Sequence, residues 1–345
     1  MKKIIVTGGT GYIGSHTTIE LINHGFDVLI LDSLVNSSVK TLDRIEEITG
    51  IRPEFYKVDI TNNFELQNIN HCFDDIIGVI HFAALKAVGE STEKPLEYYH
   101  NNIYSLINIL RMMKDKAIKN VVFSSSATVY GIPDKLPLTE ESPTKRALSP
   151  YGNTKKIAEE ILEDICKSSK DLNAISLRYF NPIGAHESGK IGELPNGVPN
   201  NLMPYITQAA AGKRKQLFVF GDDYNTPDGT AIRDYIHVVD LAKAHVKTLN
   251  RLIKKRQKNN YEVFNLGTGK GSSVMEVIQS FERTTKIKLP YKMIERRGGD
   301  VEEMFANTEL ANQELNWKAI QNLDDMTLSA WQWEKYFRSN IKSEK

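Results

Sequence analysis

The sequence predicts an α/β fold: a doubly wound parallel (Rossmann-type) sheet, followed by a smaller mixed α/β C-terminal domain. Short apolar runs alternate with helical patterns through the first half of the chain, and this rhythm is typical of a parallel sheet with helices on both faces. A glycine-rich segment, Thr7–Gly14, directly follows the first apolar run. It resembles the first strand-to-helix turn of such sheets.

The apolar runs are rich in Val, Ile and Phe and do not alternate with polar residues, as expected for strands buried on both faces. The strands predicted in this way are Lys3–Val6, Asp27–Leu31, Glu54–Val58, Ile76–Phe82, Val121–Ser124 and Ala174–Arg178. Helices are expected between them, for example around Asp43–Ile48 and at Tyr98–Met113. Right-handed crossovers would place these helices on both faces of the sheet.

The amino-acid composition of the sequence changes after Asn181. Gly, Pro and Asn dominate Pro182–Pro204 and Gly221–Gly229, which predicts loops. Val263–Leu266 is expected to return to the main sheet as a strand. The amphipathic helices expected in this half are Val239–Leu252, Ser273–Thr284 and one that begins at Leu323.

The length of 345 residues suits one large domain or two intimate ones. We predict a nucleotide-binding domain over residues 1–180, with returning segments near 236–267, and a smaller C-terminal domain over residues 181–345.

Composition excludes several classes of function. The 44 Lys+Arg and 43 Asp+Glu residues leave a net charge of +1, so the chain has no global attraction for nucleic acid or anionic membrane. Two cysteines, Cys72 and Cys166, cannot build a disulfide scaffold. No apolar run suits a signal peptide or a membrane helix. The eight histidines form no H-E-x-x-H motif, so no metal is expected. We therefore expect a soluble, cytoplasmic globular protein.

Gly8, Gly11 and Gly14 form a G-x-x-G-x-x-G pattern between the first strand and a helix. Gly8 would allow the tight turn, Gly11 the approach of a pyrophosphate to the backbone, and Gly14 close packing of helix and sheet. The free amides and partial positive charge of a helix N-terminus suit a diphosphate. The alternative is an ordinary tight turn, but this context favours a dinucleotide.

Asp32 ends the second strand. A carboxylate there accepts hydrogen bonds from the adenine-side ribose hydroxyls and repels a 2′-phosphate. No arginine follows within the next few residues to hold such a phosphate. The predicted cofactor is therefore NAD rather than NADP, although a helix-capping or turn role for Asp32 stays open.

Tyr151 and Lys155 lie four residues apart in SPYGNTK, which opens a helix, so they share one helix face. A free tyrosine has a pKa near ~10 and is a poor base at neutral pH. An adjacent ammonium and a positive nicotinamide would both lower that pKa. Tyr151 could then take a proton from a substrate hydroxyl while hydride leaves the same carbon.

Hydroxyl groups of FSSSATVYG, residues 123–131, follow the fifth strand, at the edge of the sheet where α/β proteins bind ligands. Alone, these serines could be a polar cap of a strand-to-loop junction. A Tyr–Lys pair at this spacing usually has a structural role, with the tyrosine packed and the lysine solvated. Their conjunction with the glycine loop, in this chain order, predicts a dehydrogenase-type site.

These motifs place the chain in a known context. It resembles the extended short-chain dehydrogenase/reductase superfamily and, within it, the UDP-glucose 4-epimerase family. The resemblance runs from residue 2 to about residue 335. Its matching blocks are VTGGTGYIGSHT, HFAALKAVGES, KPLEYY, FSSSATVYG, SPYGNTK, LRYFNPIGAH, GVPNNLMPYI, DGTAIRDYIHVVDLA, FNLGTG and RRGGD.

The resemblance implies a tightly held NAD, a UDP-hexose substrate and a homodimer. It makes residues 1–180, with the returning segments, an NAD-binding domain and residues 181–345 a UDP-sugar-binding domain. It implies that Tyr151 removes the proton of the sugar 4-hydroxyl and that hydride leaves C4. The 4-keto sugar then turns over, anchored by its UDP, and takes hydride back on its other face. Ser126 would hydrogen-bond the reacting hydroxyl, and Lys155 would hold the nicotinamide ribose and tune Tyr151.

The resemblance also implies two sets of contacts. The NAD contacts would be Gly8, Gly11, Tyr12, Ile13, Asp32, Asn36, Ser37, Asp59, Ile60, Phe82, Ala83, Lys86, Asn101, Ser126, Tyr151, Lys155 and Phe180. The UDP-sugar contacts would be Lys86, Ser126, Tyr151, Asn181, Asn201, Leu202, Phe220, Arg233, Arg297, Asp300 and Met304. The two arginines can neutralise a diphosphate, and Asp300 can accept from the uridine ribose.

Two positions depart from the family pattern. Ala84 stands where many relatives have glycine. Met304 stands at the position that gates the sugar 2-substituent, where a bulky tyrosine tends to exclude N-acetylhexosamines. Methionine is intermediate and flexible. UDP-glucose and UDP-galactose are the expected pair, and a UDP-N-acetylglucosamine or dual-specificity epimerase is the alternative.

Two less favoured functions remain. A nucleotide-sugar 4,6-dehydratase shares the fold, the cofactor and the Tyr–Lys pair. It carries an Asp–Glu pair for elimination of water where this chain has Ala127 and Thr128. A non-catalytic NAD-binding protein typically loses the tyrosine or the lysine, and this chain keeps both.

Overall fold

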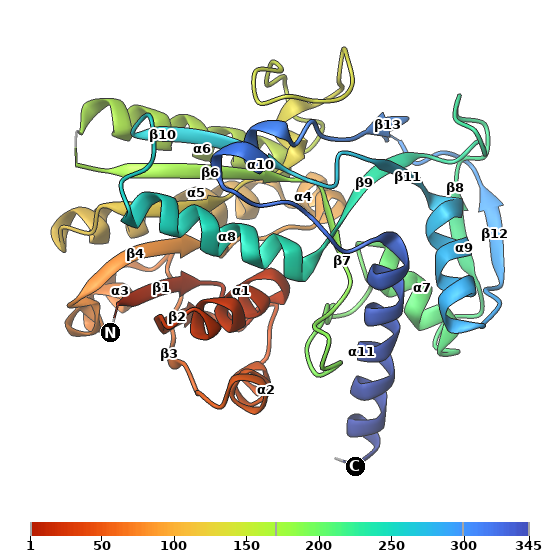
Figure 1. Ribbon diagram of the computed structural model, residues 1–345, viewed down its shortest axis with the longest axis horizontal. Helices are drawn as coiled ribbons and strands as arrows, with labels where there is room; N and C mark the ends of the chain where they lie inside the picture. The colour runs from red at the N-terminus through yellow and green to blue at the C-terminus, as the bar shows by residue number, and fades with distance from the viewer. Residues whose placement is uncertain (1, 170, 299, 344–345) are drawn as a thin grey trace.

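The computed structural model describes residues 2–169, 171–298 and 300–343 (Figure 1). Its largest element is a seven-stranded parallel sheet in the order β10-β6-β5-β4-β1-β2-β3. Its strands are β1 (Lys3–Thr7), β2 (Asp27–Asp32), β3 (Glu54–Lys57), β4 (Ile76–His81), β5 (Asn120–Ser124), β6 (Asn173–Tyr179) and β10 (Tyr261–Leu266). The predicted doubly wound sheet is confirmed, including the strand that returns near residue 263.

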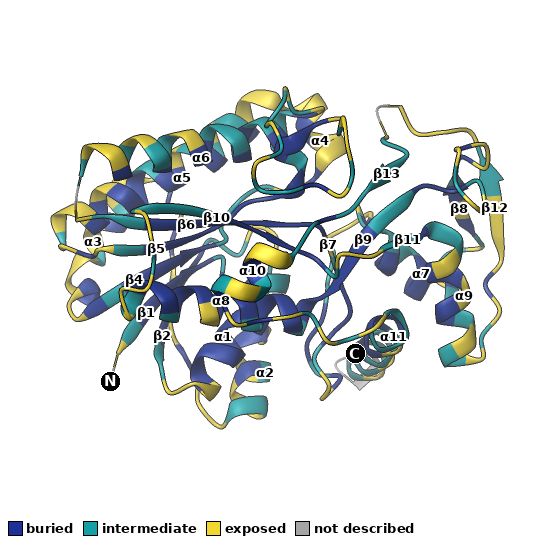
Figure 2. Ribbon diagram, turned by 45° about the horizontal axis from the view of Figure 1, so that its top comes forward, coloured by how far each residue is buried: buried dark blue, intermediate teal, exposed yellow. Residues whose placement is uncertain are grey.

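Helices cover both faces of this sheet, as predicted. One face carries α1 (Tyr12–Asn23), α2 (Lys40–Thr49) and α8 (Val238–Ile253). The other carries α3 (Asn63–Asn68), α5 (Pro95–Asp115) and α6 (Pro150–Ser168). Short helical segments are η1 (Asn70–Phe73), α4 (Val88–Glu93) and η2 (Ala127–Tyr130). Figure 2 shows the buried strands between helices whose outer sides are exposed.

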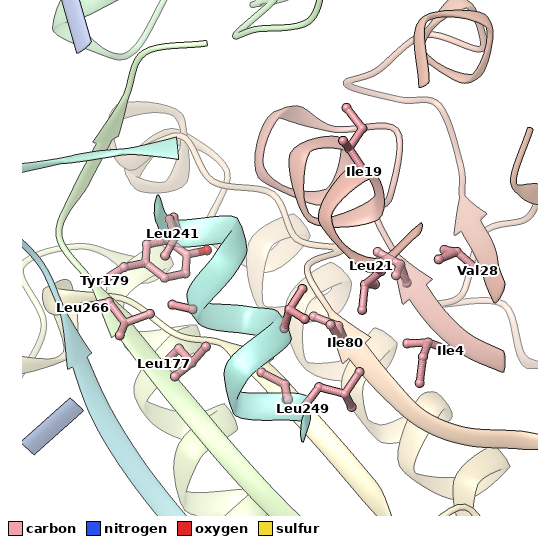
Figure 3. Close-up of a cluster of buried hydrophobic side chains, with 14 of the residues drawn as sticks. Ile4, Ile19, Leu21, Val28, Ile80, Leu177, Tyr179, Leu241, Leu249 and Leu266 are labelled. Carbon is pink, nitrogen blue, oxygen red and sulfur yellow. The ribbon is translucent and has the colours of Figure 1, made fainter. Parts of the chain in front are cut away.

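The core under α1 and α8 holds β1 and α1 in place (Figure 3). Ile19 and Leu21 of α1 pack with Leu249 of α8 against strand residues such as Ile4 and Ile80, all fully buried. Burying each such side chain stabilises the fold by roughly 1.5–3 kcal/mol. The helix that follows the glycine loop is therefore held rigidly on the sheet.

The second part of the chain is smaller and mixed. A four-stranded sheet joins β7 (Asn181–Ile183), β9 (Ile232–His237), β11 (Gly271–Ser273) and β13 (Glu303–Met304), and β8 (Leu217–Phe220) pairs with β12 (Tyr291–Ile294). Its helices are α7 (Leu202–Ala210), α9 (Val274–Thr285) and α11 (Leu323–Ser343), whereas α10 (Glu309–Glu314) packs against β10 of the large sheet. Ile206, Phe281 and Met326 lie at the centre of its core.

The chain crosses directly between the two parts. β9 belongs to the smaller sheet, and α8 follows it without a loop and packs on the face of the large sheet. Of the two predicted loops, the one over residues 182–204 contains most of β7 and the start of α7. The other, over residues 221–229, has neither helix nor strand.

Candidate active site

The glycine loop adopts the predicted tight turn between β1 and α1. Gly8 has φ +69°, and its N–H donates to the oxygen of Leu31 at 2.8 Å. A Cβ on Gly8 would lie 2.9 Å from the backbone nitrogen of Ala83, and one on Gly14 would lie 2.2 Å from the oxygen of Gly8. Gly11 precedes α1 and offers no side-chain cap. The turn therefore excludes side chains and leaves the amides of the helix N-terminus for an anion.

Asp32 is nearly buried at the carboxyl end of β2. Its carboxylate accepts hydrogen bonds from the N–H of Thr10 at 3.1 Å, the N–H of Leu34 at 2.9 Å and the hydroxyl of Ser37 at 3.1 Å. The carboxylate thus ties the glycine loop to the segment after β2, which includes Asn36. The alternative turn role of Asp32 is therefore confirmed, and its contact with the cofactor ribose stays a prediction.

Each of the three serines at the end of β5, Ser124 to Ser126, has its own partner. The main-chain oxygen of Ser124 accepts from the Lys155 ammonium at 2.6 Å, and its hydroxyl bonds Tyr179. Ser125 donates to the carboxylate of Glu159. Ser126 accepts from the N–H of Thr128 at 3.2 Å, which caps η2. The first two serines therefore fix where the third presents its hydroxyl.

Tyr151 and Lys155 lie on the first turns of α6, as the sequence predicts. Ser149 caps this helix by accepting from the N–H of Gly152 at 3.2 Å, and Pro150 begins it. The Lys155 nitrogen lies 6.0 Å from the centre of the Tyr151 ring. The Ser126 hydroxyl lies close enough to the Tyr151 phenol to lower its pKa as a hydrogen-bonding neighbour. The three predicted catalytic side chains are therefore neighbours.

In the protein alone the adjacent ammonium does not lower the pKa of Tyr151, and the lowering expected with nicotinamide bound stays a prediction. Burial raises the pKa of Tyr151 to about 12, and the Ser126 hydrogen bond offsets this only in part. Burial also lowers the pKa of Lys155 to about 7, opposed by the charge of Glu159. The reason is geometric: the Lys155 ammonium is desolvated and donates to Ser124 rather than to the phenol. The positive charge that would favour phenolate must come mainly from elsewhere.

A buried ion pair beneath the site was missed from the sequence. Arg178 donates to both carboxylate oxygens of Glu159, at 3.0, 3.1 and 2.6 Å, and to the hydroxyl of Tyr130 at 3.0 Å. Both charged side chains are almost fully buried. The sequence did carry a signal for Glu159: it follows Lys155 by four residues on α6, which places the two side chains on the same helix face.

A second missed residue joins α5 to α6. Asn102 accepts from the N–H of Leu85 at 2.8 Å and donates to the Leu85 oxygen at 3.0 Å and to Thr154 at 2.9 Å. Its predicted neighbour Asn101 donates to the Asn102 side chain at 2.9 Å. These bonds fix the loop after β4 beside the helix that carries Tyr151.

Several predicted UDP-sugar contacts gather in the smaller part of the chain. Arg233 of β9 forms an ion pair with Asp300. Arg297 lies over the ring of Phe220, 4.5 Å from its centre. Met304 of β13 pairs in register with Arg233. Two arginines, a carboxylate and an aromatic face are suitable for a diphosphate, a ribose and a base respectively.

Other predicted contacts lie where the two parts meet. Asn201 immediately precedes α7, which begins at Leu202, and its side-chain nitrogen donates to Glu193 at 2.6 Å. Lys86, from the loop after β4, contacts the same Glu193 oxygen at 3.2 Å. Glu193 was not predicted, because only the fold brings these residues together.

The remaining predicted residues occupy strand ends and loops. Asp59 is exposed and accepts from Thr61, whereas Ile60 and Phe180 are buried in the core. Phe82 and Ala83 follow β4, and Phe82 packs on the ring of His245. Asn181 begins β7 and is exposed, and Tyr12 and Ile13 begin α1. All of them follow strands or begin helices.

No group of His, Cys, Asp or Glu that could hold a metal ion is found among the residues that the structure describes. Within the same residues, no helix is long and apolar enough to cross a membrane.

Comparison with known proteins agrees with this geometry. A family model described as GDP-mannose 4,6 dehydratase matches residues 5–329. A UDP-glucose 4-epimerase from Dictyostelium discoideum is 52% identical over 332 residues, which are 96% of this chain and 95% of that protein. Another from Pasteurella multocida is 51% identical, with 96% of this chain and 97% of that protein covered.

A solved structure agrees as well. The UDP-glucose-4-epimerase of Stenotrophomonas maltophila, crystallised with bound NAD and formylated UDP-arabinopyranose, is 47% identical. It superposes with a TM-score of 0.94 over 99% of this chain and 100% of that one.

Proposed function

The chain belongs to the UDP-glucose 4-epimerase family, and from that premise we propose how its own residues interconvert UDP-glucose and UDP-galactose. The enzyme is an isomerase that uses NAD. We propose that residues 1–180, with the returning segments near 236–267, hold the cofactor and that residues 181–345 hold the UDP-hexose.

The residues around the glycine loop fit NAD. The turn at Gly8 and Gly14 has no room for a Cβ, and α1 begins without a side-chain cap. Asp32 stands at the end of β2, where a ribose would reach its carboxylate. When bound, NAD accepts a hydride from the sugar and returns it, and its nicotinamide carries a positive charge.

Tyr151 is the proposed base. Its pKa of about 12 in the protein alone means that it holds its proton at neutral pH. A positive charge beside the phenol favours phenolate, so Tyr151 becomes competent once the cofactor is in place. It then takes the proton of the sugar 4-hydroxyl, which Ser126 holds by a hydrogen bond, and later returns it.

Lys155 supports this base through position. Its ammonium is anchored on Ser124 and lies within reach of the cofactor ribose in the proposed arrangement. The carboxylate of Glu159 opposes the loss of its proton. A protonated Lys155 adds to the positive field around Tyr151.

The hexose must turn over while UDP stays bound. Arg233, Arg297 and Asp300 would hold the diphosphate and the uridine ribose, and Phe220 would contact the base. These contacts lie away from the reacting carbon, so they retain the 4-keto intermediate without fixing the sugar. The sugar then presents its other face for hydride return.

Elimination of water is disfavoured, although the matching family model is described as a dehydratase. The positions after Ser126 are Ala127 and Thr128. Neither side chain can serve as the acid or the base that a dehydratase needs. The epimerase is therefore the better function for this site.

We further propose a homodimer that uses the outer side of α5. Tyr98, Leu106 and Ile109 of this helix are buried in the core, whereas Leu96 and Tyr104 are 79% and 52% exposed. Light scattering should give the dimer mass, and Tyr104→Glu should shift it toward the monomer.

A reducing, cytoplasmic location agrees with the two free cysteines, Cys72 and Cys166.

The observation that carries the proposal is the adjacency of Tyr151, Ser126 and Lys155 at the carboxyl end of β5. The purified protein should convert UDP-galactose to UDP-glucose without added NAD. Tyr151→Phe should lose about 10²–10⁴-fold in kcat while it retains bound NAD. Full activity of that variant would remove Tyr151 from the role of base.

A further inference from the structure

We propose that Glu193 is a positioning residue for UDP-hexose binding. Its carboxylate holds the Asn201 side chain away from the N-terminus of α7 and so leaves the amides there open to the diphosphate. This inference rests on the proposed function, which assigns Asn201, Leu202 and Lys86 to the UDP-hexose.

Asn201 occupies a capping position without capping. Asparagine is among the preferred N-cap residues, and Asn201 has the extended backbone of a cap, with φ −102° and ψ 151°. Its side chain makes no cap hydrogen bond to α7 and instead donates to Glu193 at 2.6 Å.

Asn62 shows the usual behaviour in the same chain. It precedes α3 with a similar backbone, φ −91° and ψ 101°, and its side-chain oxygen accepts from the N–H groups of Phe64 and Glu65.

The contrast between the two asparagines has two causes. Pro204, the third residue of α7, has no N–H to donate to a cap, and Glu193 accepts from the Asn201 side chain and so competes for it. The first-turn N–H groups left for a ligand are those of Leu202 and Met203.

Glu193 is itself held firmly. Its side chain is only 11% exposed, and its main-chain oxygen accepts from the indole N–H of Trp333 at 2.9 Å. One carboxylate oxygen bonds both Asn201 and Lys86, while the other is buried without a partner among the described residues. A buried oxygen without a donor destabilises a fold, so stability alone does not explain a carboxylate here.

The N-terminus of α7 therefore has no side-chain cap, which makes it suitable for an anion. α7 has nine residues and no acidic side chain in its first turn, so its N-terminal amides and partial positive charge favour a phosphate group. Lys86 is kept nearby by the same carboxylate and is half exposed. A diphosphate with two negative charges would attract it away from Glu193.

A double-mutant cycle tests this inference. Calorimetry with UDP on the purified holoenzyme should show about tenfold weaker binding for Glu193→Ala, which is about 1.4 kcal/mol, since a side-chain cap of that order now competes with the ligand. The KM for UDP-galactose should rise likewise, with kcat within about twofold. Glu193→Gln can still accept from Asn201 and should stay within about threefold of wild type.

In an Asn201→Ala background, itself expected to bind UDP less tightly, Glu193→Ala should have a clearly smaller effect, limited to the loss of its contact with Lys86. Glu47→Gln is the control, because Glu47 pairs with Lys190 on the surface; it should bind UDP as wild type does.

Equal losses from Glu193→Ala in both backgrounds, or no loss in either, would overturn the inference. Wild type that fails to bind UDP would instead contradict the proposed function, so the two failures are distinguishable. Thermal unfolding shows whether each variant folds. If Glu193→Ala does not fold, Glu193→Asp replaces it, because the shorter side chain cannot reach Asn201 and should give the same loss.

Discussion

The side-chain nitrogen of Lys155 donates a hydrogen bond to the main-chain oxygen of Ser124, 2.6 Å away. This bond joins the helix that carries Tyr151 to the strand end that leads to Ser126. It also buries an ammonium group, and the burial lowers the pKa of Lys155 to about 7. The same contact therefore positions the site and makes its charge depend on pH.

That burial predicts a pH-dependent stability. Between pH 7 and 10.5 the unfolded chain keeps the Lys155 proton and the native state loses it, so the contribution of Lys155 to stability rises with pH. The stability of Lys155→Met relative to wild type should thus fall as pH rises from 7 to 10, by at most ~1.4 kcal/mol per pH unit. Urea unfolding of the NAD-free proteins measures this.

Lys167→Met, at the exposed end of the same helix, is the matched control and should show no such trend. A constant difference between Lys155→Met and wild type across this range would contradict the lowered pKa.

Buried histidines predict loss of stability in acid. Burial lowers the pKa of His16 and His81 to about 3 and that of His237 and His245 to about 4. Below pH 6.5 the unfolded chain binds these protons and the native state does not, so stability falls as pH falls. The four groups together should give a slope of roughly 5 kcal/mol per pH unit near pH 5.

His245→Phe isolates one of these groups. Its ring packs between Phe82 and Tyr179, and phenylalanine fills similar space. Denaturant unfolding at pH 7, 6 and 5 should show a slope reduced by about one proton. An unchanged slope would show that His245 does not resist protonation.

Gly14→Ala should damage cofactor binding. The new methyl group would lie 2.2 Å from the main-chain oxygen of Gly8, and backbone cannot move aside cheaply. We expect about 1–3 kcal/mol of lost stability and loss of copurified NAD, measured by absorbance after denaturation. Gly89→Ala is the control, since a Cβ there meets nothing within 4 Å. NAD retention in Gly14→Ala would contradict the claim that the tight packing at Gly14 shapes the cofactor site.

Met304 should set tolerance for N-acetylated sugars. It is half-buried beside the cluster of Phe180 and Tyr130. Met304→Ala should raise the ratio of activity on UDP-N-acetylglucosamine to that on UDP-galactose by about tenfold, and Met304→Tyr should lower it, since pocket volume discriminates by roughly 1–3 kcal/mol. Met304→Leu, of similar size, should change the ratio little. Equal ratios of the two activities in wild type and in all three variants would mean that residue 304 does not face the sugar.

The sequence was informative where the determinants are local. β1, β2, β4, β5 and β6 are largely apolar runs buried on both faces. The expectation was wrong for β3, an edge strand whose Glu54 and Lys57 are exposed.

A helix period alone placed Tyr151 and Lys155 on one face of α6. Gly8 and Gly14 are required by a turn of a few residues. In each case the neighbours that fix the structure lie close in the chain.

Longer-range contacts could not be predicted in this way. Glu193 meets Lys86, 107 residues away in the chain, and Arg178 meets Glu159 from another element. The pKa of Tyr151 also depends on burial, which a helix pattern does not show. Charge compensation and solvent exclusion arise only when separate elements pack.

The central claim is that one sugar carbon is oxidised and then re-reduced from its other face. The direct test uses UDP-galactose with deuterium at C4 of the hexose and follows the product by NMR. The account predicts UDP-glucose that keeps the deuterium at C4, with none gained there when unlabelled substrate reacts in D₂O. Loss of the label to solvent, or solvent deuterium at C4, would contradict it.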